Sequence, residues 1–318
     1  MANVIITGAL GTLGRAATEH LTACGHRITT LDFRAASGAI AASHVADIRD
    51  PDTYRHLLAD AEVVVHLASL HGRDHMTRFG FDDFWSVNVD GTLALYRSII
   101  DTAVTHVVLA SSMAVYGPIP VAPRTDWEVR TESTSTTSYD AYSLTKLTNE
   151  ATADYTAADT GIPTTVLRFG HFTPADPLHY AFRLLFGGVD TRDAAHAIAA
   201  AIAHPPEKGS VAKLNIHAPS PLIERIDSLS GPALDQVRDL YPVFIDRLHD
   251  AGIDPVVHLW GRSTWPSTAA TTAIGYSPTY TFGRFAHAYL TGDMSDYGNL
   301  LGPRWGVTDK SLTTSVIR

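Results

Sequence analysis

The sequence predicts an α/β protein in which a doubly wound parallel sheet of the Rossmann type is completed by a small C-terminal region. Two observations favour this fold class. Short, continuously apolar segments alternate with helix-like segments through the first half of the chain, and the connection after the first apolar segment is rich in glycine. Strands of this kind are typical of a parallel sheet that is covered by helices on both faces. The crossovers between them should be right-handed.

The elements are expected in βαβ order up to residue 168. Strands are predicted at residues 3–7, 27–31, 44–46, 62–67, 105–110 and 164–168, and helices at residues 12–24, 84–102 and 142–160. Gly161 is a natural stop for the last of these helices. Beyond residue 168 the alternation loosens. Helices are expected there at residues 190–204, 234–251 and 282–290, and strands at residues 211–218 and 255–259.

Composition excludes several classes of function. The chain has 318 residues, 45% of them hydrophobic, and a formal net charge of -9. An acidic protein is a poor electrostatic match to nucleic acid or to an anionic membrane. The single cysteine, Cys24, can form no intramolecular disulfide and lacks the spacing of a zinc site, so no metal is expected. No signal peptide or apolar run of transmembrane length is visible. We therefore expect a cytoplasmic protein.

The first chemical signal is the turn of residues 7–14, which contains Gly8, Gly11 and Gly14. Glycines between a strand and a helix let the chain turn tightly, and they let a diphosphate approach the helix N-terminus. Asp32 ends the second predicted strand, where a carboxylate can accept the ribose hydroxyls of a dinucleotide and repel a 2′-phosphate. Arg34 could instead hold that phosphate. We expect NAD, with NADP the less favoured cofactor; a strand-end cap is the alternative for Asp32.

The second signal joins three polar residues. Tyr142 and Lys146 are four residues apart and therefore share one face of a helix. An ammonium beside a phenol stabilises the phenolate, so the phenol can exchange a proton near neutral pH. Ser112 follows a buried strand, at the sheet edge where ligands bind. Each residue alone has an ordinary structural explanation; their order on a Rossmann framework is what indicates an enzyme.

Together these motifs resemble the extended short-chain dehydrogenase/reductases, the NAD-dependent epimerase/dehydratase family, over roughly residues 3–290. The resemblance rests on the turn and on segments 47–48, 66–69, 88–92, 111–117 and 142–146. It implies a catalytic set of Ser112, Tyr142 and Lys146, with Lys146 also holding the nicotinamide ribose. The implied cofactor contacts are Gly8, Leu10, Gly11, Thr12, Leu13, Gly14, Asp32, Phe33, Arg34, Asp47, Ile48, Leu67, Ala68, Ser69, Asn88, Ala110, Tyr142, Lys146 and Phe169.

Two departures from the family pattern narrow the reaction. Met113 and Ala114 stand where the family's dehydratases carry Asp and Glu, and neither can move a proton, so a dehydratase of that type is excluded. His171 replaces an Asn, and the segment 172–189 is short for holding a nucleotide diphosphate. A small substrate such as a free sugar, a sugar acid or a hydroxy acid is therefore expected, as in uronate dehydrogenases, which this architecture resembles.

The candidate substrate residues are His71, Ser112, Met113, His171 and Arg192. Packing or surface histidines and a solvated arginine are the alternatives for the ionisable ones. Trp265 either closes the pocket or is a core aromatic.

Three functions stay open on the sequence. The first is an NAD(P)-dependent oxidoreductase that transfers a hydride between nicotinamide and a small alcohol or ketone. The second is an NAD-dependent sugar epimerase, and the third is a non-catalytic dinucleotide-binding sensor. Residues 1–170 are expected to form the dinucleotide-binding domain, residues 171–300 to complete the sheet and the substrate pocket, and residues 301–318 to form a tail. The polar segment 118–138 is either a cover over the site or a surface excursion. A homodimer through residues 84–102 and 142–160 is expected from the resemblance.

Overall fold

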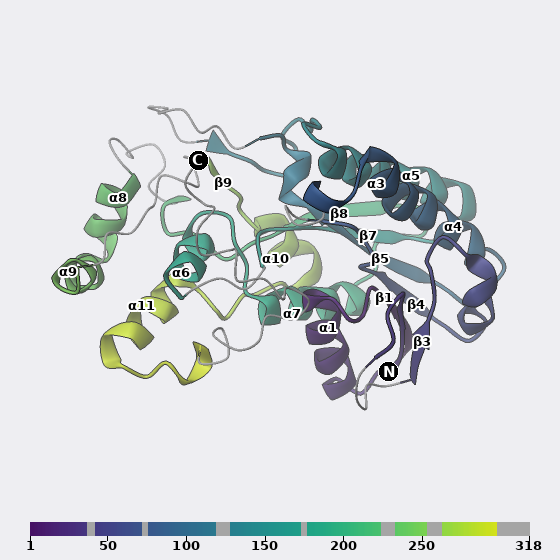
Figure 1. The fold of residues 1–318 in the computed structure, drawn as a ribbon, viewed down its shortest axis with the longest axis horizontal. Coiled ribbons are helices and arrows are strands. Elements are labelled where there is room, and N and C mark those ends of the chain that lie inside the picture. Colours follow the sequence, from purple (N-terminus) through teal and green to yellow (C-terminus); the bar gives the residue numbers. More distant parts are fainter. Residues whose placement is uncertain are drawn as a thin grey trace.

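The computed structural model describes residues 1–36, 42–71, 76–118, 128–172, 177–223, 233–252 and 263–297. Its centre is a seven-stranded parallel sheet in the order β3-β2-β1-β4-β5-β7-β8 (Figure 1). The strands are β1 (Asn3–Thr7), β2 (Arg27–Asp32), β3 (Ala42–Val45), β4 (Val63–His66), β5 (His106–Ser112), β7 (Thr164–Phe169) and β8 (Val211–Ile216). A two-stranded sheet pairs β6 (Glu128–Val129) with β9 (Ser263–Thr264). The predicted Rossmann-type sheet is confirmed.

Helices cover both faces of the sheet because successive strand residues are apolar on both sides. Val4 and Ile6 of β1 pack with α1 (Thr12–Ala23), α7 (Thr191–Ala203) and α10 (Thr268–Ile274). Ile5, which points the other way, belongs to the core that contains residues of α4 (Gly91–Ser98) and α5 (Ala141–Thr160). The chain order reverses between β1 and β4, so the crevice at their carboxyl ends is where a ligand is expected.

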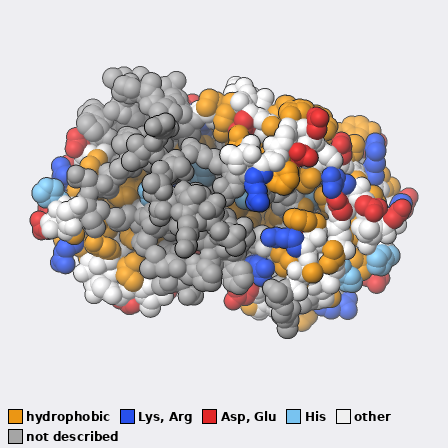
Figure 2. All heavy atoms as spheres, viewed as in Figure 1, with side chains coloured by type: hydrophobic (Ala, Val, Ile, Leu, Met, Phe, Trp, Pro, Cys, Tyr) orange, Lys and Arg blue, Asp and Glu red, His pale blue; other side chains and the backbone are white. Residues whose placement is uncertain are grey.

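The second half of the chain adds a group of helices beside the sheet (Figure 1). It is formed by α6 (Pro177–Leu185), α8 (Ala233–Leu240), α9 (Pro242–Asp250) and α11 (Phe282–Thr291). The rings of Phe244, Phe282 and Phe285 pack edge to face within it. On the face drawn in Figure 2, the described lysine and arginine side chains are interspersed with aspartate and glutamate.

Two predicted helices are divided. The helix expected at residues 234–251 is two helices, because Pro242 lacks the N–H that a continuing helix needs and instead begins α9. The helix expected at residues 84–102 consists of α3 (Phe81–Trp85), a π-helical turn (Ser86–Asp90) and α4, which ends at Ser98. The strand expected at residues 255–259 and the tail at residues 301–318 lie outside the described residues.

Three buried histidines are expected to make the fold sensitive to acid. Burial lowers the pKa of His66 to about 3, of His106 to about 4 and of His217 to about 3. The unfolded chain therefore binds more protons below the ordinary histidine value of about 6.5. Stability is fully present above that pH and falls as the pH drops toward 3–4, by about 1.4 kcal/mol per pH unit for each histidine.

Urea unfolding between pH 8 and pH 5 measures this loss. His106→Gln keeps a hydrogen-bonding group beside Thr165 Oγ1, which lies 3.0 Å from His106 Nε2. It should reduce the slope of unfolding free energy against pH by about 1.4 kcal/mol per unit below pH 6. His249→Gln, at an exposed position, is the control. Equal slopes in His106→Gln and the unsubstituted protein would contradict the account.

Candidate active site

The glycine-rich turn lies at the switch point between β1 and β4. Gly8 has a positive φ of 68°, and a Cβ there would lie 2.7 Å from the backbone nitrogen of Ala68. A Cβ on Gly14 would lie 2.3 Å from the Gly8 carbonyl oxygen. Thr7 fixes the other side, because its hydroxyl accepts the N–H groups of Leu67 and Ala68 at 3.2 Å. The turn is therefore lined by backbone at close approach.

The N-terminus of α1 is open to an anion. Gly11 caps this 12-residue helix without a side-chain hydrogen bond. The N–H groups of the first turn and the helix dipole thus point into the crevice without a side-chain acceptor of their own. These are the features that a dinucleotide diphosphate requires, so the residues present fit that group.

Asp32 serves two purposes at the end of β2. Its Oδ2 accepts the Leu10 N–H at 2.9 Å, and its Oδ1 accepts the backbone N–H and the Nε of Arg34 at 3.1 Å. The carboxylate thus fastens the turn, in keeping with the strand-end cap. It accepts three of about four possible hydrogen bonds, which leaves capacity for a ribose hydroxyl. Beside it the ring of Phe33 is 72% exposed and offers a flat surface for stacking.

The remaining predicted cofactor residues differ in their surroundings. Asp47 pairs with Arg49, and this hydrogen bond lowers the pKa of the Asp47 carboxyl. Asn88 is fully buried and bridges two elements: it accepts the Leu70 N–H at 2.7 Å and donates to Thr145 Oγ1 at 2.9 Å. Asn88 therefore holds the loop after β4 against α5, and its role as a cofactor contact stays a prediction.

The three predicted catalytic residues are brought together by β5 and α5. Asp140 caps α5 by accepting the Ser143 N–H at 2.7 Å, which places Tyr142 in the first turn. The Tyr142 hydroxyl lies near the Ser112 side chain at the end of β5, and the interaction with Ser112 lowers the pKa of Tyr142. Lys146 Nζ donates to the Ala110 carbonyl at 2.9 Å and lies 5.7 Å from the centre of the Tyr142 ring.

Burial sets the protonation of this group. It raises the pKa of Tyr142 to about 12, against the lowering effect of the interaction with Ser112. It lowers the pKa of Lys146 to about 8, against the raising effect of Glu150. Near neutral pH the phenol therefore carries its proton and the lysine its charge. Such a pair can exchange one proton with a ligand oxygen held at Ser112.

The substrate side is bounded by Met113 and His171. Met113 is buried against Trp265, and a Cβ on Gly187 would lie 2.4 Å from the Trp265 ring. Trp265 is 1% exposed and stacks on His217 at 5.5 Å, so it is a core aromatic behind Met113. The His171 side chain is exposed, yet surrounding protein and then the charge of Arg183 lower its pKa to about 4.

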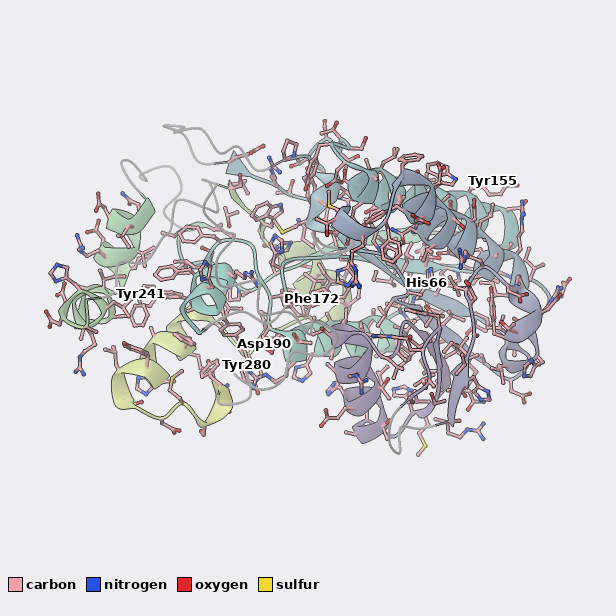
Figure 3. The ribbon with its side chains drawn as sticks, in the orientation of Figure 1. His66, Tyr155, Phe172, Asp190, Tyr241 and Tyr280 are labelled. Carbon is pink, nitrogen blue, oxygen red and sulfur yellow. The ribbon has the colours of Figure 1, made fainter. Side chains whose placement is uncertain are left out.

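Arg192 has a structural role that the sequence did not reveal. Its guanidinium donates to both Asp190 carboxylate oxygens at 2.9 and 2.8 Å and to the Asp296 carbonyl at 2.9 Å. It also lies 3.4 Å from the centre of the Tyr280 ring, and Figure 3 shows Asp190 and Tyr280 near each other. Since these contacts hold Tyr280 and Asp296 against α7, we withdraw Arg192 from the candidate substrate residues.

His71 lies exposed in the loop after β4.

Sequence reasoning missed the polar residues behind the site. Glu150, Arg168, Tyr116 and Asn215 form a buried hydrogen-bonded chain. The one available signal was the position of Glu150, four residues after Lys146 on the same helical face. Within the described ranges, no group of three histidine, cysteine or acidic side chains is placed to hold a metal ion. No helix in that part of the chain is long and apolar enough to cross a membrane.

Comparisons with known proteins agree with this geometry. The model of the NAD dependent epimerase/dehydratase family matches residues 4–177. L-arabinose 1-dehydrogenase (NAD(P)(+)) from Haloferax volcanii is 29% identical over 183 residues, 55% of this chain and 69% of that protein. UDP-glucose 4-epimerase from Streptomyces lividans is 29% identical over 123 residues, 36% of each chain. A short-chain dehydrogenase/reductase superfamily structure from Agrobacterium tumefaciens, with bound NAD, has a TM-score of 0.67 at 20% identity, covering 92% of this chain and 98% of that one.

The glycine-rich turn gives a direct test of dinucleotide binding. Gly8→Ala places a Cβ 2.7 Å from the Ala68 nitrogen at a positive φ, which forces the turn and the loop after β4 apart. The Kd for NADH, followed by its fluorescence, should rise about tenfold or more. Gly80→Ala is the control, since its Cβ meets only a carboxylate oxygen at 3.9 Å. An unchanged Kd in a folded Gly8→Ala protein would show that the dinucleotide binds elsewhere.

Proposed function

The chain belongs to the NAD-dependent epimerase/dehydratase family, and on that premise we propose that it is a dehydrogenase that oxidises a small sugar or sugar acid with NAD. The observation that carries the proposal is that Ser112, Tyr142 and Lys146 lie close together at the carboxyl edge of the sheet. Met113, which follows Ser112, is buried among apolar side chains and adds no second acid or base. The site therefore supports exchange of a single proton.

The residues divide the work as follows. NAD, when bound against the glycine-rich turn and Asp32, supplies the hydride acceptor. Ser112 donates a hydrogen bond to the substrate oxygen. Tyr142 first releases its own proton to solvent, and the resulting phenolate takes the proton of the substrate hydroxyl. Because burial holds the pKa of Tyr142 near 12, the phenolate needs a positive charge close by, and Lys146 provides one.

Two observations favour a small substrate over a nucleotide sugar. The segment after β7 folds back at once: His171 N–H donates to the Gly187 carbonyl at 3.1 Å, and Val189 N–H donates to the His171 carbonyl at 3.0 Å. His171 and Gly188 form an isolated β-bridge. The helix that the structure describes between these two residues is α6. The match to an arabinose dehydrogenase also extends over more of this chain than the match to the UDP-glucose epimerase.

An epimerase is the second candidate, because sugar epimerases are among the relatives. It would use the same three residues and return the hydride to the opposite face of the sugar. The two reactions differ in their net effect on the cofactor: a dehydrogenase accumulates NADH and an epimerase does not.

The cytoplasmic location stays a prediction.

Tyr142→Phe tests the enzyme proposal. The variant keeps the ring but loses the group that takes the proton, so NADH formation from sugars should fall by 10²-fold or more, as is typical for removal of a general base. The Kd for NADH should change little, because the glycine-rich turn is untouched. Tyr289→Phe, on α11 and outside both the proposed catalytic set and the proposed dimer contact, is the control. Full turnover by Tyr142→Phe would exclude the assigned role.

We also propose a homodimer through α3 and α5. Phe81 is 51% exposed and lines a surface hollow with Asp82, Trp85, Ser86 and Asp90, and Tyr155 of α5 is 68% exposed. Exposed aromatic residues of this kind are enriched at protein interfaces. A second copy of the chain would bury them.

Light scattering after size exclusion tests this assembly. The unsubstituted protein should have twice the monomer mass, and Phe81→Asp/Tyr155→Asp should have the monomer mass, since it places two charges in the apolar contact. Val243→Asp, at a 65% exposed position on α9, should stay dimeric. A dimer that survives the double substitution would place the contact on another surface.

A further inference from the structure

The end of β5 and the first turns of α5 are joined by a ladder of three polar contacts. Lys146 Nζ donates to the Ala110 carbonyl at 2.9 Å, and the Ser111 hydroxyl donates to Glu150 Oε1 at 2.6 Å. The Ser112 side chain lies near Tyr142 and lowers its pKa. Three consecutive strand residues thus bind three helix residues spaced four apart, which form one stripe along α5. Two of the three helix residues belong to the proposed catalytic set, and the third is Glu150.

The Glu150 carboxylate is also bound by Arg168 of β7 through two hydrogen bonds. The Arg168 guanidinium donates to it twice, from Nη2 to Oε2 at 2.7 Å and from Nε to Oε1 at 3.0 Å, and both side chains are at most 4% exposed. Arg168 also donates to the Tyr116 hydroxyl at 2.9 Å, and that hydroxyl donates to Asn215 Oδ1 at 2.7 Å. A buried ion pair contributes little to stability compared with apolar side chains of the same size. Stability alone therefore does not account for the pair.

We propose that Glu150 is a positioning residue of the active site with two roles. It fixes the position of α5 along β5, and it supplies the negative charge that keeps the Lys146 ammonium beside Tyr142. This inference rests on the proposed role of Lys146. Arg168 acts through Glu150 by fixing its carboxylate, and β7 thereby supports a site to which it contributes no reacting group.

The charges around Lys146 are consistent with this assignment. From α5 it faces Tyr142 and Glu150, and from β5 the Ala110 carbonyl. From β4 it faces His66, which is neutral near pH 7 because burial and then the Lys146 charge lower its pKa to about 3. Burial lowers the pKa of Lys146 to about 8, and Glu150 is the group that opposes this shift. Without Glu150, Lys146 would lose its proton at a lower pH.

The chain suits a direct measurement because it contains only four lysines. Protein labelled with ¹³C-lysine is titrated by NMR, and Lys146→Arg identifies the Lys146 signal. In Glu150→Gln, which keeps an acceptor for Ser111 and Arg168, the Lys146 midpoint should fall by about one pH unit or more. Asp154→Asn, which removes an exposed carboxylate from the same helix, should leave the midpoint unchanged. The alkaline limit of kcat should move with the Lys146 midpoint.

Glu150→Gln/Arg168→Gln provides the same test if the single variant does not fold, because it leaves no unpaired buried charge. An unchanged Lys146 midpoint in whichever variant folds would overturn the proposal. The lysine titration needs no substrate, so it can be read even if no sugar is oxidised. Absence of turnover in the unsubstituted protein would count against the proposed function, whereas an unshifted lysine would count against the role of Glu150.

Discussion

The contact between the end of β5 and the first turns of α5 determines what this site can do. Tyr142 and Lys146 lie one turn apart on α5, and both meet polar groups of the strand segment 110–112. Burial of this contact raises the pKa of Tyr142 to about 12 and lowers that of Lys146 to about 8. Proton exchange therefore depends on holding the two side chains together, and the capped start of α5 and the buried Glu150–Arg168 pair both do this.

The rest of the molecule places two further groups of residues beside that contact. On one side, backbone close approach at Gly8 and the uncapped start of α1 form a cradle for a diphosphate. On the other side, Met113 and Gly187 pack on Trp265, and the chain returns at His171 after a short excursion. The C-terminal segment is fastened by Arg192, which connects Asp190 with Tyr280. Each group is thus formed by elements that are distant in sequence and meet at the carboxyl edge of one sheet.

The sequence predicted the features that depend on local pattern. Apolar strands, the glycine turn and the spacing of Tyr142 and Lys146 are readable along the chain, and the parallel sheet confirms the fold. Features that depend on tertiary partners were not readable. The use of Arg192 as a fastener requires knowing that Tyr280 and Asp296 fold back onto α7. The burial of Glu150 likewise depends on Arg168 of β7, the next element along the chain, since a glutamate on a helix is ordinarily solvated.

We propose that the protein oxidises a small sugar by hydride transfer from the sugar to NAD, with Tyr142 as the base. A free aldose deuterated at its reducing carbon tests it most directly, with NMR used to follow the label. The account predicts one deuterium in each reduced dinucleotide, with NADH equivalents equal to the sugar consumed. Conversion of the sugar with all of the deuterium still in the sugar, and with no net reduced dinucleotide, would contradict it and favour the epimerase.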